Sequence, residues 1–501
     1  MRLATALAAA ARLAMLPCPV GAAATSTAEA QQTAEPEVFY HIFMRSFRDS
    51  NGDRSGDLDG LTQKLDYLKD LGITSILLTP LQPSPFYHNY FATDFEGIDP
   101  DFGTMQDYFE FVRAAHARGL KVYLDQEIQY VAEGHPWLSE ARGNPDHPDG
   151  NKILWNRPDV NEEPEPFLTY PAWRHYDGEY IGIAMIDMRQ PEVKAYFEKL
   201  LHFWVDPHGD GSFRDGVDGF RIDHMMDDLD NKGRLTNLFA DFWTPIFDSL
   251  KAKKPDLRIV AEQSDWGYGE DWLKRGNADL VFAFPLRGAL TKLDKQEIVS
   301  ALRETEAKTP AGKSQIVFVE NHDTDRFMSL IGNDPKRARV GAAFNILLKG
   351  EPLLYYGQEI GMRGRTGSDF LTDSAHIPLR EAFRWTRDLE APGSAIWYKA
   401  DAHWWHERFN RSGDGVSVEE QDRDPTSLLN WYRALLNLRA TRSEFRTGDQ
   451  RILCENVGGL LSIVRDNENG RSVLIPNLRE TTEGIPAGLV EPGSVNLLAG
   501  G

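Results

Sequence analysis

Four short apolar runs of this chain are followed by charged residues. Two of these charged residues lie in one pentapeptide. Arg221 and Asp223 belong to GFRID, Gly219–Asp223, where the alternation of a strand places both side chains on one face. An arginine beside an aspartate keeps that carboxyl ionised near neutral pH, as a nucleophilic carboxylate requires. A structural ion pair would give the same pattern, because structural pairs also shift pKa values. The other three runs therefore decide between the two interpretations.

The other three apolar runs end in groups of the same kind. They are followed by Asp125, by Glu262, and by His322 with Asp323. Four separate strands that end in charged residues are hard to explain as solvated surface. This repetition favours a functional site over a structural ion pair.

Two carboxyl groups that face one glycosidic bond are the minimum for glycoside hydrolysis, one ionised for attack and one protonated for release. Asp223 fits the first role, because Arg221 holds it ionised. Glu262 fits the second, because partial burial after an apolar strand would raise its pKa. Asp323 would bind sugar hydroxyls and help to keep Glu262 protonated by like-charge repulsion.

Short apolar runs alternate with amphipathic helical patterns along most of the chain. The predicted strands are Val38–Phe43, Ile73–Leu78, Leu120–Leu124, Val217–Ile222, Ile259–Ala261, Leu280–Phe284, Ile316–Val319 and Leu353–Tyr356. Eight strands alternating with helices predict an α/β fold, a parallel sheet closed into a (β/α)8 TIM barrel. The carboxyl ends of barrel strands meet at one mouth, so the charged groups are expected to converge there.

Two further regions depart from this alternation. Residues 126–187 are rich in Pro, Asn and Asp and too long for an ordinary loop, so they predict a small domain inserted after the third strand. Residues 36–125 and 188–444 make up the predicted catalytic barrel. Short strand-like runs over residues 445–501 predict a short C-terminal all-β domain.

Residues 1–30 have the pattern of a secretory signal peptide. Arg2 supplies the positive start, an Ala- and Leu-rich run follows, and small residues provide cleavage sites. A disordered Ala-rich extension is the alternative. The pattern predicts a secreted or periplasmic protein, and no later run reaches the roughly 18 apolar residues of a membrane helix. The two cysteines, Cys18 and Cys454, are too few for a disulfide framework.

The charge of the chain limits its partners. A net charge of −21 over 501 residues disfavours nucleic acid and anionic membranes and suits a neutral ligand. The 12 Trp, 16 Tyr and 26 Phe offer flat faces that suit sugars, although most are expected in the core. No organic cofactor is expected, and the oligomeric state is left open.

The run DSNGDRSGD is a candidate calcium loop. It places the oxygen-bearing side chains of Asp49, Asn51, Asp53 and Asp57 at nearly alternate positions. This spacing wraps hard oxygen ligands around one Ca²⁺. We expect a structural ion held by these four residues and a backbone carbonyl, remote from the chemistry, with a metal-free polar turn as the alternative.

Several motifs in a specific order carry a family resemblance. They are GFRID, AEQ at 261–263, ENHDTDR at 320–326, YHNYFATDFEGIDPDFGT at 87–104, GEPLLYYGQEIG at 350–361 and IPLREAFRW at 377–385. In this order and spacing they are highly specific. With them the chain resembles the α-amylase family, glycoside hydrolase family thirteen, over nearly its whole mature length.

The resemblance implies a role for each charged residue. Asp223 would be the nucleophile, Glu262 the general acid/base and Asp323 the stabiliser of the transition state. The subsite for the sugar being cleaved would be lined by Tyr90, Asp125, Arg221 and His322, with Tyr90 stacked under the sugar. The family's outcome is retention at the anomeric carbon, which places the two catalytic carboxyls about 5–5.5 Å apart.

The chain departs from the family's pattern at two places. Gln129 and Tyr130 stand where the third-strand motif has Asn-His, of which the His touches the sugar and the Asn commonly binds calcium. Met226 and Asp227 replace a Lys-His pair that follows the nucleophile. Sugar recognition is expected to differ at both places.

The expected function is retaining hydrolysis of α-glucosidic bonds, with α-1,4 bonds in starch-derived maltooligosaccharides as the expected target. An exo-acting α-glucosidase and a glucan transglycosylase of the same family are the alternatives. His224, which follows the nucleophile, does not decide the linkage. A non-catalytic sugar-binding or transporter-associated barrel is a further alternative, against which the presence of all three carboxylates argues.

Overall fold

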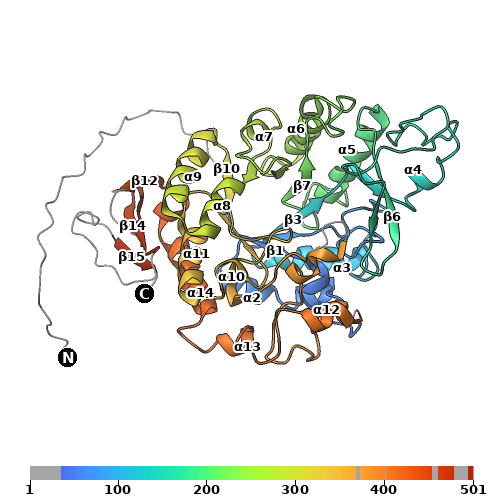
Figure 1. The fold of residues 1–501 in the computed structure, drawn as a ribbon. Helices are drawn as coiled ribbons and strands as arrows, with labels where there is room; N and C mark the ends of the chain where they lie inside the picture. The colour runs from blue at the N-terminus through green and yellow to red at the C-terminus, as the bar shows by residue number, and fades with distance from the viewer. Residues whose placement is uncertain (1–34, 368–372, 401, 454–460, 479–494, 500–501) are drawn as a thin grey trace, which may run out of the picture.

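A computed structural model of the chain describes residues 35–367, 373–400, 402–453, 461–478 and 495–499. The predicted signal peptide and both cysteines lie outside the described residues. The barrel occupies the centre of the molecule, with the C-terminal sheet on one side and the segment inserted after the third barrel strand on the other (Figure 1). No helix among the described residues is long and apolar enough to span a membrane.

Eight parallel strands close into a barrel, which confirms the predicted fold class. Their order around the barrel is β1-β11-β10-β9-β8-β7-β3-β2. Their bounds are β1 (Phe39–Ile42), β2 (Ser75–Leu78), β3 (Lys121–Gln126), β7 (Gly219–Met225), β8 (Arg258–Gln263), β9 (Leu280–Phe282), β10 (Ser314–Val317) and β11 (Glu351–Tyr355). All eight predicted strands are present, with ends shifted by a few residues.

The α-helices are mostly short. They are α1 (Leu58–Thr62), α2 (Leu65–Leu71), α3 (Met105–Ala117), α4 (Pro136–Ser139), α5 (Pro191–Val205), α6 (Thr244–Lys253), α7 (Glu270–Lys274), α8 (Phe284–Lys292), α9 (Lys295–Lys308), α10 (Phe327–Leu330), α11 (Pro335–Leu347), α12 (Ala402–Glu407), α13 (Val418–Gln421), α14 (Leu428–Thr441) and α15 (Ser443–Thr447). The 3-10 helices are η1 (Met44–Ser46), η3 (Gln358–Ile360), η4 (Asp373–Leu379) and η5 (Trp397–Ala400), and η2 (Phe239–Trp243) is a π-helical turn.

Local sequence signals set the helix ends. The Thr104 hydroxyl accepts a hydrogen bond from the Asp107 backbone N–H, and the Asp107 carboxylate accepts one from the Thr104 N–H, which forms a capping box at the start of α3. Helix α2 ends at Gly72, whose φ of +99° suits glycine. Pro245 lies in the first turn of α6, directly after the π-helical turn η2, and so falls where the hydrogen-bond pattern of the helix changes.

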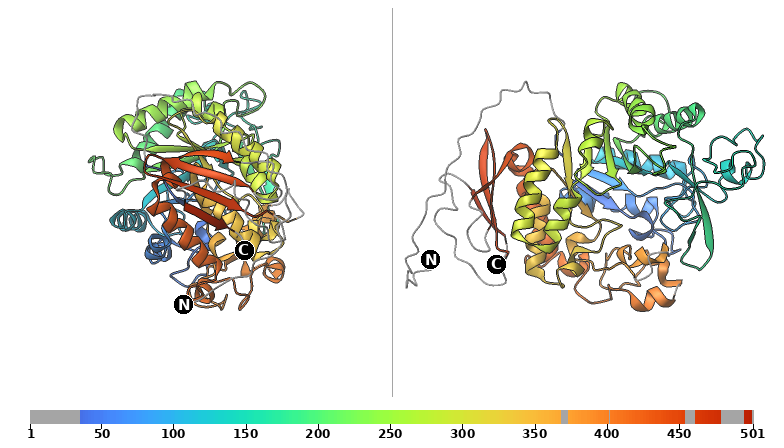
Figure 2. Two further views of the ribbon diagram at one scale, coloured as in Figure 1. Left: turned by 90° about the vertical axis from the view of Figure 1, so that its left-hand side faces the viewer. Right: turned by 45° about the horizontal axis from the view of Figure 1, so that its top comes forward.

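Two smaller sheets flank the barrel. Between β3 and α5, strands β4 (Tyr130–Ala132), β5 (Ala172–Arg174) and β6 (Tyr180–Met185) form an antiparallel sheet of order β4-β6-β5. At the C-terminal side, β12 (Asp449–Leu453), β13 (Ser462–Asn467) and β14 (Gly470–Pro476) are antiparallel, and β15 (Val495–Ala499) joins β14 in parallel (Figure 2). The predicted domain boundaries remain a prediction.

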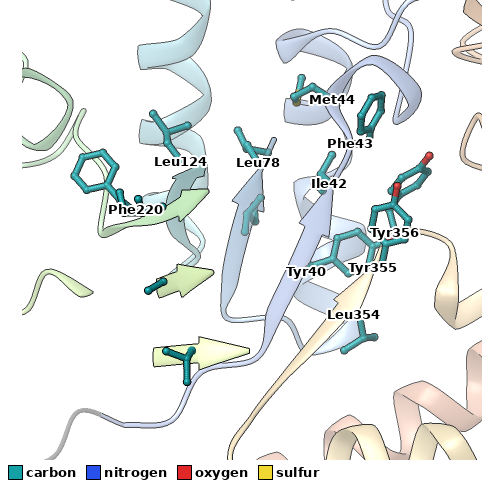
Figure 3. Packing of buried hydrophobic residues seen from close by; sticks show 14 of the residues in the cluster. Tyr40, Ile42, Phe43, Met44, Leu78, Leu124, Phe220, Leu354, Tyr355 and Tyr356 are labelled. Carbon is teal, nitrogen blue, oxygen red and sulfur yellow. The ribbon is translucent and has the colours of Figure 1, made fainter. Parts of the chain in front are cut away.

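The core has two layers that follow from the alternation of side chains along the strands. One face of the strands points outward to the helices, as with Ile42, Leu78, Leu124 and Phe220 (Figure 3). The other face fills the barrel, where a separate cluster gathers Phe39, Leu77, Tyr123, Val260, Leu280, Phe282, Phe284, Ile316, Phe318 and Leu353. The interior is therefore packed between two polar layers: Glu37, Arg258 and Glu351 form ion pairs below this cluster, and the polar groups at the carboxyl ends of the strands gather above it.

Candidate active site

The register of the strands decides which charged groups enter the barrel mouth. Asp125 lies two residues after an interior residue of β3, so it faces inward as well. Asp125 pairs in register with Arg221 of β7, and Arg221 pairs with Val260 of β8, which belongs to the interior cluster. Asp223 and Glu262 come two residues later on β7 and β8. All of these groups therefore face one space above the apolar interior.

Arg221 is the centre of this space. Its Nη1 donates to both carboxylate oxygens of Asp125 at 2.8 Å and to Asp223 Oδ1 at 2.5 Å, and its Nη2 donates to Glu262 Oε2 at 2.6 Å. All four side chains are buried. The predicted Arg221–Asp223 contact is present, but the same guanidinium also holds the two other carboxyls.

Tyr90 connects these carboxyls to a second group from β10. Its hydroxyl donates to Asp125 Oδ2 at 2.6 Å and lies 2.8 Å from His322 Nε2, and its ring stacks on the His322 ring at 5.3 Å between centroids. His322 Nε2 lies 3.0 Å from Asp323 Oδ2. The structure therefore brings all seven predicted catalytic and sugar-binding residues into one connected cluster.

The surroundings of Asp223 and Glu262 shift the pKa values of these two carboxyls in opposite directions. Burial raises the pKa of Glu262 to about 7, and the charge of Asp223 adds to this effect while Arg221 opposes it. Burial also acts to raise the pKa of Asp223, but the charges of His224 and Arg221 outweigh it and hold this pKa below its ordinary value. Burial also raises the pKa of Asp125 to about 7, while the Arg221 guanidinium opposes this shift. At neutral pH an ionised Asp223 therefore faces a Glu262 that still holds a proton in a large fraction of molecules.

Arg380 completes the cluster on the side of Asp323 and was not found from the sequence. Its Nη2 donates to Asp323 Oδ1 at 2.9 Å, its Nε to the His322 carbonyl at 3.1 Å and its Nη1 to the Tyr87 hydroxyl at 2.9 Å. Burial acts to raise the pKa of Asp323, but contact with His322 and Arg380 holds it well below its ordinary value. Arg380 belongs to the IPLREAFRW run, which was the only sequence signal for it.

The two departures from the family's pattern have structural contacts of their own. The Gln129 amide donates to the backbone carbonyls of Asp223 at 2.7 Å and His224 at 2.9 Å, so it supports the strand end. The Tyr130 ring packs edge-on against Phe167 at 4.8 Å between centroids. Asp227 pairs with Arg275 at the end of α7 and accepts the backbone N–H at the start of η2.

A metal ion is not assigned to the catalytic cluster. Within the described residues, Asp223, His224 and Glu262 are the one set of three acidic or histidine side chains whose ligand atoms lie within 4.8 Å of one another. The guanidinium of Arg221 already contacts both carboxylates, and a fixed cation there disfavours a second one by repulsion.

Replacing Arg221 with methionine is expected to lower the free energy of unfolding by about 3–5 kcal/mol, the range for removing one partner of a buried ion pair. Three buried carboxyls would lose their shared cation. Protonation relieves this cost, so the loss should be larger at pH 8 than at pH 5. Denaturant unfolding of both proteins at the two pH values measures it.

The matched control is Arg118→Met. Arg118 pairs with the mostly exposed Asp66, so its loss should cost about 1 kcal/mol or less at either pH. Equal losses for the two variants, or a loss for the Arg221 variant that does not change with pH, would contradict a shared buried cation.

Comparison with known proteins agrees with this geometry. Residues 41–448 match the family model described as "Alpha amylase, catalytic domain". The chain is 29% identical to Alpha-amylase 3 of Dictyoglomus thermophilum over 88% of this chain and 84% of that protein, and 28% identical to trehalose synthase/amylase TreS of Mycolicibacterium smegmatis over 86% and 80%. Its structure is similar to the crystal structure of the α-amylase from H. orenii, with a TM-score of 0.73 and 29% identity over 89% of this chain and 90% of that one. The chain belongs to the α-amylase family of glycoside hydrolases.

Proposed function

We propose that this enzyme hydrolyses α-1,4-glucosidic bonds of starch-derived maltooligosaccharides with retention at the anomeric carbon. The proposal rests on one observation. The Arg221 guanidinium contacts both Asp223 and Glu262, and the pKa of Asp223 is lowered while that of Glu262 is raised. Oxygens of these two carboxyls lie within 4.8 Å of each other. This separation supports a retaining mechanism, because an inverting enzyme needs about 6.5–9.5 Å between its carboxyls to admit a water.

The residues support a double displacement. A carboxylate oxygen of Asp223 attacks the anomeric carbon, while Glu262 gives its proton to the glycosidic oxygen and releases the leaving sugar. Glu262, now ionised, then takes a proton from water, and the water oxygen replaces Asp223 at the anomeric carbon. Asp323, held ionised by Arg380, is placed to stabilise the positive charge that develops on the sugar ring.

The names of the relatives support both the substrate class and the alternatives. An α-amylase, a trehalose synthase/amylase and a probable oligo-1,6-glucosidase match the chain at 29%, 28% and 25% identity. These names imply hydrolysis of two linkages and a transfer of the glucosyl group. The α-1,4 hydrolase is preferred because the curated relative and the solved structure that are each 29% identical to this chain are both named as α-amylases.

The product profile on soluble starch and maltoheptaose tests the proposal. Short maltooligosaccharides from internal cuts, formed first as α-anomers in a proton NMR time course, are the expected result. Glucose alone would indicate an exo-acting α-glucosidase, and longer chains or a new disaccharide would indicate a transglycosylase. First products of β configuration would overturn retention.

We also propose that the DSNGDRSGD loop binds a structural calcium ion. Its side chains offer hard oxygen ligands, but the carboxylates of Asp49, Asp53 and Asp57 do not all lie within 4.8 Å of one another in this structure. Two of them accept backbone hydrogen bonds, Asp49 from Gly52 at 2.6 Å, and Asp57 from Gly60 at 2.6 Å and Ser50 at 2.8 Å. If the ion binds, excess calcium at a hundred times its Kd adds about 2.7 kcal/mol to stability. Removal by EGTA should therefore lower the melting temperature, and Asp53→Ala should abolish the effect. An EGTA-insensitive melting temperature would contradict the site.

A further inference from the structure

The residue that follows the nucleophile makes contacts that the proposed mechanism does not use. His224 Nδ1 lies 3.1 Å from Asp223 Oδ2, and the His224 backbone N–H donates to Glu262 Oε2 at 3.3 Å. Arg221 holds the other oxygen of Asp223. Both oxygens of the nucleophile are therefore occupied, one by a guanidinium and one by an imidazole.

The backbone at His224 is bent to make this contact. Its φ of +39° is uncommon for a residue with a side chain, and the pairing of β7 with β8 shifts register between Ile222 and Met225. In a regular strand, residues 223 and 224 would point to opposite faces. The irregularity lets the His224 ring reach the carboxylate beside it, at a cost in backbone energy that other contacts must offset.

Side chains of the segment that follows Asp125 hold this bend. The Gln129 amide donates to the carbonyls of both Asp223 and His224, which ties the two residues to the segment between β3 and β4. Glu127 accepts the Gln129 backbone N–H at 2.6 Å, while its other oxygen is buried without a hydrogen-bond partner. Burial raises the pKa of Glu127 well above its ordinary value.

We propose that His224 is a positioning residue that carries a second positive charge against the nucleophile and sets the pH range of the enzyme. The proposal rests on the role of Asp223 in the proposed function. The titratable groups that act on His224 are Asp223 on β7, Glu262 on β8 and Glu127 after β3, and Asp223 is in turn affected by Arg221 and by Asp323 after β10. Phe167 of the inserted segment covers the ring from the other side, at 5.8 Å between centroids.

The charge of His224 shifts the pKa of both catalytic carboxyls, Asp223 and Glu262, in the same direction. A positive imidazole favours the ionised form of a neighbouring carboxyl and so lowers its pKa. Burial and Asp223 act on the imidazole in opposite directions, and the net pKa of His224 is raised, so it stays charged at neutral pH. Removal of this charge should raise the pKa of Asp223 and that of Glu262, and so move the acid and the alkaline limb of the activity profile to higher pH together.

The test is the pH dependence of kcat/KM for the wild type, His224→Gln and His224→Lys on a maltooligosaccharide that the wild type cleaves. Glutamine keeps a hydrogen-bond donor without charge, and lysine keeps the charge. Both limbs of the Gln variant should move up by about one pH unit, the lower end of the range for a nearby charge since the ring is about one-third exposed. The Lys variant should remain closer to the wild type.

The matched control is His116→Gln. His116 forms the same kind of pair, with Nε2 at 2.9 Å from Asp218 Oδ2, but at the opposite end of the barrel strands, so its profile should match the wild type. Unmoved limbs in the Gln variant, or equal shifts in the Gln and Lys variants, would overturn the proposal. If the Gln variant does not fold, the Lys variant alone tests the proposal. Limbs of its kcat/KM profile that move by one pH unit, although the charge is retained, would contradict the charge effect. A wild type that cleaves no α-glucan would instead overturn the proposed function.

Discussion

Asp223→Asn is expected to lower kcat on maltooligosaccharides by at least about 10⁴-fold, the scale seen when a hydrolase loses its nucleophile. The amide has nearly the size of the carboxylate and can keep one contact with Arg221. It carries no charge and cannot form the glycosyl ester that splits the reaction into two steps. The measurement is the initial rate of product release on maltoheptaose. Wild-type rates no higher than those of the variant, on every α-glucan tried, would exclude the hydrolase.

Chemical rescue separates loss of the nucleophile from a damaged site. Asp223→Gly leaves room for azide, which would attack the anomeric carbon directly and give a β-glycosyl azide by a single inversion. The same treatment of Glu262→Gly should give an α-glycosyl azide, because Asp223 still forms the ester and azide then displaces it. The same anomer from both variants would contradict the assignment of the two roles.

Glu262→Gln is expected to lower kcat on maltooligosaccharides by about 10²- to 10⁴-fold, the usual contribution of a general acid. The sugar leaving group needs a proton, whereas a nitrophenolate leaves without one. The formation of the glycosyl-enzyme from a nitrophenyl α-glucoside should therefore be affected much less. Pre-steady-state release of nitrophenol measures this step directly, and an equal loss on both substrates would contradict a proton-donating role.

The pH dependence provides a second test of Glu262. The wild type needs this group protonated, and its pKa is raised to about 7, so kcat/KM should fall as the pH rises through this value. Glutamine does not titrate, so the decline should disappear or move in the variant. An unchanged alkaline limb would assign the limb to another group, with Asp125 as the first candidate because its pKa is also raised to about 7.

The sequence by itself determined which charged residues carry the chemistry and that they lie at the carboxyl ends of the strands. Asp125 and Glu262 each come two residues after an apolar strand residue, and Arg221 and Asp223 are themselves two residues apart, which is a local property of each strand. Once eight such strands alternate with helices, closure of the barrel is the only further step needed to bring their carboxyl ends together. For this reason the barrel and the convergence of the charged residues at the strand ends could be predicted without any contact between distant segments being known, whereas Tyr90 was implied only by the family resemblance.

Only the tertiary structure decided how the charges are shared. Arg380 lies 57 residues from Asp323, and no periodic pattern reports a contact over such a separation, because it depends on the path of the loops between them. The same is true of Arg221, whose one guanidinium serves three carboxyls from three strands. His224 belongs to this class as well: a regular strand turns it away from Asp223, and only a bend held by Gln129 brings the two side chains together.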